Sequence, residues 1–261
     1  MEAYTDFAYV YDVFMDNTPY DKWGGLLVSR LEKEGITDGI LLDLGCGTGN
    51  MTELLSEKGY DMIGVDYSGE MLNVAMDKRA RSGRQILYLQ QDMREFELYG
   101  TVRAVVCVCD SLNYLLEKEE IEDTFRLVNN YLDPGGLFLF DFNTVYKYET
   151  VIGDATIAEN RDNCSFIWEN FYEEEGQINE YDLTVFVKEQ EEEELFRKFT
   201  ETNYQRGYTL QQLKRLLDTR GLVFMDALDA DTLDEVTDTS ERIFCVAREQ
   251  GKVCDRSPDG I

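Results

Sequence analysis

The stretch LLDLGCGTG (Leu41–Gly49) decides the fold. An apolar run that ends in an acidic residue and continues into a glycine-rich turn is typical of a strand that leads into a ligand-binding loop. A second apolar run, MIGVD, ends at Asp66, 21 positions after Gly45, and places a carboxylate at the tip of the next strand. Together the two segments predict a site that holds a nucleoside cofactor at the edge of a parallel sheet.

The spacing of the glycines narrows the choice of cofactor. Glycines at positions 45, 47 and 49 follow a GxGxG pattern. The dinucleotide fingerprint is GxGxxG, which brings a helix N-terminus to a pyrophosphate. Here the third glycine comes one residue too early. The loop therefore has backbone room for a ligand near the strand end but lacks the phosphate-facing register of a dinucleotide site.

Strand and helix patterns alternate along the first part of the chain. Strands are predicted over 40–44, 60–66, 86–90, 102–109 and 137–142, and helices over 50–58, 69–81 and 118–132. The last of these helices stops at the breaker Asp133-Pro134-Gly135-Gly136. This order predicts a parallel sheet with helices on both faces and right-handed crossovers.

The pattern changes after Asn143. Extended segments over 165–172, 180–188 and 194–205, in which Tyr181, Leu183 and Val185 alternate with more polar residues, predict a half-buried antiparallel sheet. A helix over 209–219 and strands over 222–228 and 242–247 complete the fold. We therefore expect an α/β, Rossmann-like, seven-stranded, mostly parallel sheet with a small antiparallel insertion after strand five.

The expected organisation has four parts. They are an N-terminal lid and helix (1–35), a cofactor-binding domain (36–145 and 207–250), a β insertion over the substrate pocket (146–206) and a tail (251–261).

Composition excludes several classes of function. The chain has 53 acidic and 25 basic residues, a net charge of −28, which argues against a nucleic-acid partner. It has no histidine, so a mechanism that needs imidazole is excluded. Its six cysteines lack metal-ligand spacing, and we expect reduced core thiols and no metal site. The N-terminus is acidic and aromatic, and no apolar run approaches the roughly 20 residues that cross a bilayer. We expect a cytoplasmic protein without a membrane partner.

The glycine loop, with Asp43 two residues before its first glycine, resembles motif I of the class I S-adenosylmethionine-dependent methyltransferases. Further blocks follow in the order typical of that family: Asp66, Gln91-Asp92-Met93, VCDSLN (108–113) and Pro134-Gly135-Gly136. The opening YxxFAxxYD, the segments CDSLNYL and FDFNT, and the β insertion resemble its small-molecule N-methyltransferase subgroup. The resemblance implies S-adenosyl-L-methionine as the cofactor.

The resemblance also implies which residues bind the cofactor. Asp66 would bind the ribose hydroxyls, Asp92 would face the adenine amino group, and the aromatic N-terminal segment would close as a lid. The alternative for the lid aromatics is that they only cover the sheet edge. The candidates are Tyr4, Tyr11, Tyr20, Trp23, Asp43, Gly45, Cys46, Gly47, Asp66, Tyr67, Met71, Asp92, Met93, Val108, Cys109 and Asp110.

Candidates for the substrate side lie near the strand ends and in the segment ETNYQRGY (201–208). Asn113 and Asn143 follow strands four and five, and Tyr204 and Arg206 lie near the return to the sheet. Arg206 would clamp an anionic group or, alternatively, pair with a glutamate. Asp110 is a candidate proton acceptor or amine anchor, with a loop cap as the alternative. No catalytic residue is assigned, because in-line methyl transfer can rely on alignment and desolvation.

The expected function is transfer of a methyl group to N or O of a small molecule. Glycine is disfavoured as that molecule, because Phe142-Asn143 provides no arginine where the glycine enzymes hold a carboxylate. A tRNA or protein methyltransferase and a non-catalytic cofactor-binding scaffold are the alternatives. The acidic insertion leaves two roles open: a roof over the substrate pocket or a contact in a homodimer.

Overall fold

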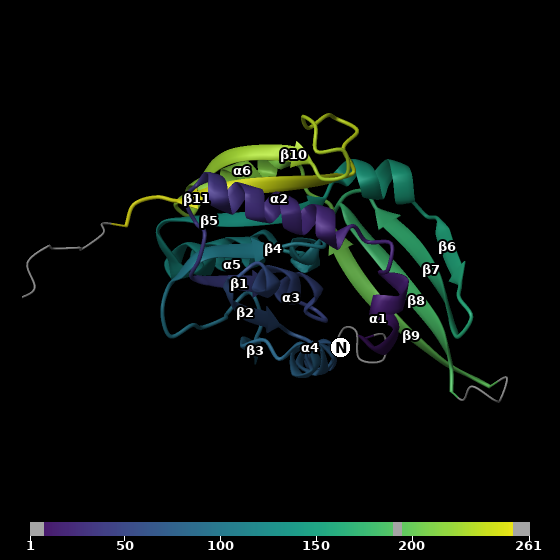
Figure 1. Cartoon of the computed structure of the whole chain (residues 1–261). Helices are drawn as coiled ribbons and strands as arrows, with labels where there is room; N and C mark the ends of the chain where they lie inside the picture. Colours follow the sequence, from purple (N-terminus) through teal and green to yellow (C-terminus); the bar gives the residue numbers. More distant parts are fainter. Residues whose placement is uncertain (1–7, 190–194, 253–261) are drawn as a thin grey trace, which may run out of the picture.

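The computed structural model describes residues 8–189 and 195–252 as two β-sheets with helices packed around the larger one (Figure 1). The larger sheet has seven strands in the order β10-β11-β5-β4-β1-β2-β3, and only β11 runs antiparallel to its neighbours. Its strands are β1 (Ile40–Leu44), β2 (Asp61–Asp66), β3 (Ile86–Gln90), β4 (Val102–Cys107), β5 (Leu132–Asn143), β10 (Leu222–Asp229) and β11 (Arg242–Glu249). The predicted Rossmann-like sheet is confirmed.

Helices cover both faces of this sheet because its strands carry apolar side chains on both faces. Leu41 packs with α2 and α3, whereas its neighbour Leu42 packs with α5 and α6 on the opposite face. The helices are α1 (Ala8–Phe14), α2 (Tyr20–Lys33), α3 (Asn50–Glu57), α4 (Gly69–Ser82), α5 (Lys118–Tyr131) and α6 (Leu210–Thr219), with short turns η1 (Ser111–Tyr114) and η2 (Lys147–Ile152). In the described part of the chain no helix is long and apolar enough to span a bilayer.

The smaller sheet is antiparallel and follows β5 in the chain, as predicted. Its order is β6-β7-β8-β9, formed by β6 (Thr156–Asn160), β7 (Cys164–Glu173), β8 (Ile178–Lys188) and β9 (Phe196–Arg206). Tyr181, Leu183 and Val185 form its buried face and pack with Ala8 and Phe14 of α1. Helix α1 therefore lies against the smaller sheet, next to the carboxyl edge of the larger one (Figure 1).

Three details differ from the sequence prediction. Strand β6 was not predicted, because most of its side chains are exposed and give no apolar alternation. Strand β5 begins at Leu132, so it includes the expected breaker, and its pairing with β4 shifts register between Val102 and Ala104. Strand β4 ends at Cys107 and not at Cys109, because the backbone turns left-handed there.

Candidate functional site

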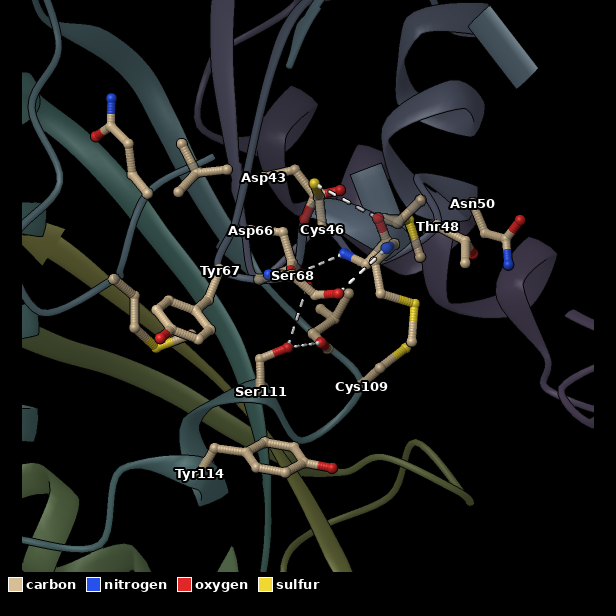
Figure 2. A pocket seen from close by; sticks show the side chains of 18 of the residues that line it. Asp43, Cys46, Thr48, Asn50, Asp66, Tyr67, Ser68, Cys109, Ser111 and Tyr114 are labelled. Carbon is tan, nitrogen blue, oxygen red and sulfur yellow. Dashed lines mark hydrogen bonds between the residues drawn. The ribbon is translucent and has the colours of Figure 1, made fainter. Parts of the chain in front are cut away.

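A cavity of about 250 Å³ opens at the carboxyl ends of β1, β2 and β4. Strands β1 and β4 are neighbours in the sheet, but the chain leaves them in opposite directions, and such a switch point is where parallel sheets bind ligands. Figure 2 shows Asp66, at the end of β2, and Ser111 and Tyr114, from η1, around this cavity. The predicted residues that line it are Tyr11, Tyr20, Asp43, Gly45, Cys46, Gly47, Asp66, Tyr67, Met71, Asp92, Met93, Val108 and Cys109.

The glycine loop forms a concave surface that side chains at the glycine positions would fill. Gly45 and Gly47 have φ values of 77° and 53°, in the left-handed region that glycine adopts without strain. A Cβ on Gly45 would lie 2.7 Å from Ser111 Cβ, whereas a Cβ on Gly47 would meet open space beside the cavity. The Gly45 and Cys46 amides donate to the Val65 carbonyl, at 2.8 and 3.0 Å, which fixes the loop to β2. The loop thus leaves room for a ligand against its backbone.

Asp66 is the acidic group at the tip of β2. Its carboxylate accepts hydrogen bonds from the Gly47 amide at 2.7 Å and from the Ser68 amide at 2.8 Å. Burial raises the pKa of Asp66, although these hydrogen bonds partly offset the effect. Each oxygen accepts one of the two bonds and keeps lone-pair capacity for another donor. The carboxylate therefore suits a vicinal diol such as a ribose.

Asp92 lies at another side of the cavity and is held by Arg94. The Arg94 Nε donates to both carboxylate oxygens, at 2.9 and 3.1 Å, and its guanidinium also reaches Glu120. Burial tends to raise the pKa of Asp92, but the hydrogen bonds from Arg94 outweigh it and the pKa is lowered. Asp92 is thus an anionic acceptor with a fixed orientation.

Asp43 lies beneath the glycine loop and is only 1% exposed. The Thr52 hydroxyl donates to its Oδ2 at 2.5 Å. Burial raises the pKa of Asp43 to about 7, so this carboxyl titrates near neutral pH.

The N-terminal helices bring Tyr11 and Tyr20 to the cavity. Burial raises the pKa of both phenols, which keeps them protonated at neutral pH. Asp12 fastens α1 to the glycine loop: it accepts from Thr48 Oγ1 at 2.7 Å and from Asn50 Nδ2 at 2.9 Å. It also forms a 2.6 Å ion pair with Lys78 of α4. The aromatic segment therefore covers the cavity and is tied to residues that line it.

Another wall of the cavity comes from the segment after β4. Ser111 Oγ donates to the Gly45 carbonyl at 3.2 Å, and Tyr114 contacts Tyr181 of β8 through a 2.8 Å bond between hydroxyls. Further lining residues that were not predicted are Thr48, Asn50, Met51, Val65, Ser68, Gln91, Arg94, Ser111, Tyr114 and Leu115. Most of them are sequence neighbours of predicted residues, and that proximity was the available signal.

Among the described residues, two predicted cofactor contacts, Trp23 and Asp110, do not line the cavity. Tyr4 lies outside the described residues. The Trp23 ring packs beside Arg242, 5.2 Å from its guanidinium carbon, and Trp23 Nε1 donates to the Ala230 carbonyl at 3.3 Å. Asp110 pairs with the same arginine at 2.7 Å. Trp23 and Asp110 face an internal ion-pair cluster instead of the cavity.

The four predicted substrate residues also lie away from the cavity lining. Asn113 is buried and bonds Asn143 through two hydrogen bonds, which joins η1 to the end of β5. Arg206 donates to the Leu116 carbonyl at 2.6 Å, and Tyr204 is 43% exposed. Among the described residues, Arg206 forms no ion pair with a glutamate.

The fold and the site define a class of protein. A parallel sheet with a GxGxG loop at its switch point, a carboxylate at the tip of the second strand and tyrosines from the N-terminal helices beside the cavity define a nucleoside-binding enzyme of the class I methyltransferase type. The concave surface at Gly47, the carboxylate of Asp66 and the buried aromatic rings fit S-adenosylmethionine, because aromatic faces tolerate its sulfonium charge.

Comparison with known proteins gives the family. Residues 41–136 match the family described as Methyltransferase domain. The chain is 37% identical to the Bacillus subtilis (strain 168) protein YqeM, named as a methyltransferase, over 94% of this chain and 96% of that protein. A crystal structure of an S-adenosylmethionine-dependent methyltransferase from Clostridium acetobutylicum ATCC 824 superposes with a TM-score of 0.86 and 29% identity, covering 95% of this chain and 99% of that one. The chain belongs to the S-adenosylmethionine-dependent methyltransferases, and its cofactor is S-adenosylmethionine.

A further relative matches only part of the chain. The dTDP-3-amino-3,4,6-trideoxy-alpha-D-glucopyranose N,N-dimethyltransferase of Streptomyces venezuelae is 35% identical over 101 residues, which cover 39% of this chain and 41% of that protein. That match is partial and falls short of the chain's full length.

Proposed function

We propose that this enzyme transfers the methyl group of S-adenosylmethionine to a nitrogen or oxygen atom of a small molecule, which binds beneath the insertion formed by residues 146–206. The supporting observation is the contact between Tyr114 and Tyr181, which connects the cofactor cavity to the buried face of β8. The partial similarity to an amino-sugar dimethyltransferase favours nitrogen as the acceptor atom.

The buried face of the insertion carries polar groups suited to an oxygen-rich acceptor. Asn203 is directly opposite Tyr181 in the β8–β9 pairing and is 5% exposed. Its side-chain nitrogen, like Trp168 Nε1, has no hydrogen-bond partner among the described residues. A buried donor without a partner costs free energy, so oxygen atoms of a ligand would stabilise both groups. Amino sugars and other hydroxylated amines meet this requirement.

The chain's contribution to the reaction is alignment and exclusion of water. Bound S-adenosylmethionine supplies an electrophilic methyl group on a sulfonium. The carboxylates of Asp43, Asp66 and Asp92 line the cavity, and each already accepts a hydrogen bond from the protein. The phenols of Tyr11 and Tyr20 remain neutral. We therefore expect an amine acceptor to enter unprotonated and the site to act through positioning.

A screen with methyl-labelled cofactor tests this function. Panels of amines, amino sugars and phenols are offered to the enzyme, and labelled small-molecule product is measured. Tyr181→Phe removes the hydroxyl on the buried face and is expected to lower kcat/KM about tenfold. Tyr204→Phe, at the exposed face of β9, is the matched control and should leave turnover unchanged.

Two results would contradict the proposal. Label transferred to tRNA or protein, with none in any small molecule, would favour a macromolecular acceptor. Cofactor binding without any turnover on the three panels would favour a non-catalytic scaffold.

A further inference from the structure

The turn after β4 contains two consecutive strained residues. Cys109 and Asp110 have φ values of 61° and 54°, and neither is a glycine. The left-handed region is costly for residues with a Cβ, so the surrounding structure must hold such a turn.

A buried ion-pair cluster maintains this turn. Asp141 of β5 is 2% exposed, and its two oxygens accept the backbone amides of Cys109, at 3.1 Å, and Asp110, at 2.7 Å. Arg242 of β11 bonds both acids, reaching Asp141 Oδ2 at 3.2 Å and Asp110 Oδ1 at 2.7 Å. The carboxylate and the guanidinium therefore fix both the backbone and the side chain of the turn.

This turn also shapes the cofactor cavity. Val108 and Cys109 line it, and the next residue after the turn, Ser111, donates to the Gly45 carbonyl of the glycine loop. On its other side, Asp110 Oδ2 accepts a 2.7 Å hydrogen bond from Gln205 of the insertion. Relaxation of the turn would shift the cavity wall and the Ser111 contact together.

We propose that Asp141 and Arg242 are positioning residues for the cofactor: they hold Cys109 and Asp110 in the left-handed conformation that completes the cavity wall. Neither Asp141 nor Arg242 lines the cavity, so both act through the turn. Asp110 is accordingly the charged partner of Arg242, a role different from proton acceptor.

A cycle of variants that relieves the strain tests this proposal. Asp141→Asn keeps the size of the side chain, but its amide can accept only one of the two backbone N–H bonds and opposes the other with its own N–H groups. Affinity for S-adenosylhomocysteine, measured by calorimetry, should fall about tenfold. In the Cys109→Gly background, where glycine adopts the left-handed region freely, the same substitution should cost less than about threefold.

A merely structural role predicts a different pattern. It would lower the melting temperature in both backgrounds, and Asp141→Asn would reduce the affinity for S-adenosylhomocysteine by the same factor in both. An equal loss of affinity in the two backgrounds, or no loss in either, would overturn the proposal. If Asp141→Asn does not fold, Arg242→Lys keeps the charge but cannot bridge both acids, and should weaken binding about fivefold. Arg220→Met removes a 2.7 Å ion pair with Glu122, away from the cavity, and as the control should leave affinity unchanged. Unaltered affinity in Arg242→Lys would likewise refute the role.

Discussion

Replacing Asp43 by asparagine should raise the stability of the protein relative to the parent as the pH increases. The carboxyl group is 1% exposed, and burial raises its pKa from an ordinary value of 3.8 to about 7. The folded state therefore binds this proton more tightly than the unfolded state. Stability contributed by the protonated group is fully present below pH 3.8 and is lost as the pH rises to about 7.

The size of the effect follows from the two pKa values. Their difference corresponds to at most about 4 kcal/mol of unfolding free energy lost across that pH range. The side chain introduced by Asp43→Asn does not titrate, and its oxygen can still accept from Thr52. The free energy of unfolding of the variant minus that of the parent should therefore rise between pH 5 and pH 8, by roughly 2 to 3 kcal/mol.

Urea unfolding of parent and variant at both pH values measures this difference. The protein has 53 acidic residues, so its overall pH dependence has many contributors, and only the variant-minus-parent value isolates Asp43. Asp61→Asn, at the exposed start of β2, corrects for the loss of one negative charge. A variant-minus-parent value that is the same at pH 5 and pH 8 would refute the argument that burial holds the proton on Asp43.

Three further substitutions address the cofactor site. Asp66→Ala should abolish the thermal stabilisation given by S-adenosylmethionine and by its demethylated product. For the parent this stabilisation is about 2.7 kcal/mol at a ligand concentration 100 times Kd. Thermal shifts that are retained in the variant would exclude Asp66 as a cofactor ligand. Asp12→Asn removes the ion pair with Lys78, so dissociation of the demethylated product, measured by stopped flow, should accelerate about fivefold. An unchanged rate would show that this ion pair does not hold helix α1 over the cavity. Trp23→Phe loses the hydrogen bond to the Ala230 carbonyl and should destabilise the protein by about 1 to 2 kcal/mol, measured by urea unfolding. Its affinity for the demethylated product should stay within about twofold of the parent. A tenfold loss of affinity would mean that Trp23 does contact the cofactor.

The lining of the cavity around the glycine loop could be predicted because its signals are local. Asp43 and Asp66 lie at the carboxyl ends of β1 and β2, and the glycine loop begins directly after β1. The carboxyl ends of parallel strands meet at one sheet edge. The glycine spacing therefore predicted where the loop lies at the sheet edge as well as which residues form it. Thr48, although not predicted, lies within the same loop.

The partners of Trp23 and Asp110 could not be predicted because they are distant in sequence. Arg242, which lies beside both, follows Asp110 by 132 residues and belongs to the last strand. An aromatic ring on an amphipathic helix and an acid after a strand have the same local pattern whether they face a ligand or a buried arginine. Strand β6 escaped prediction for a different reason: its exposed side chains impose no alternation.

One segment of the chain links the cofactor cavity to the insertion formed by residues 146–206. The turn at Cys109 and Asp110 reaches the glycine loop through Ser111 and the insertion through Gln205. In-line methyl transfer requires donor, methyl carbon and acceptor to be collinear, so small errors of position reduce the rate steeply. A rigid, strained turn that bonds both the glycine loop and the insertion would supply this alignment. That arrangement accounts for how a chain with no histidine can support the reaction.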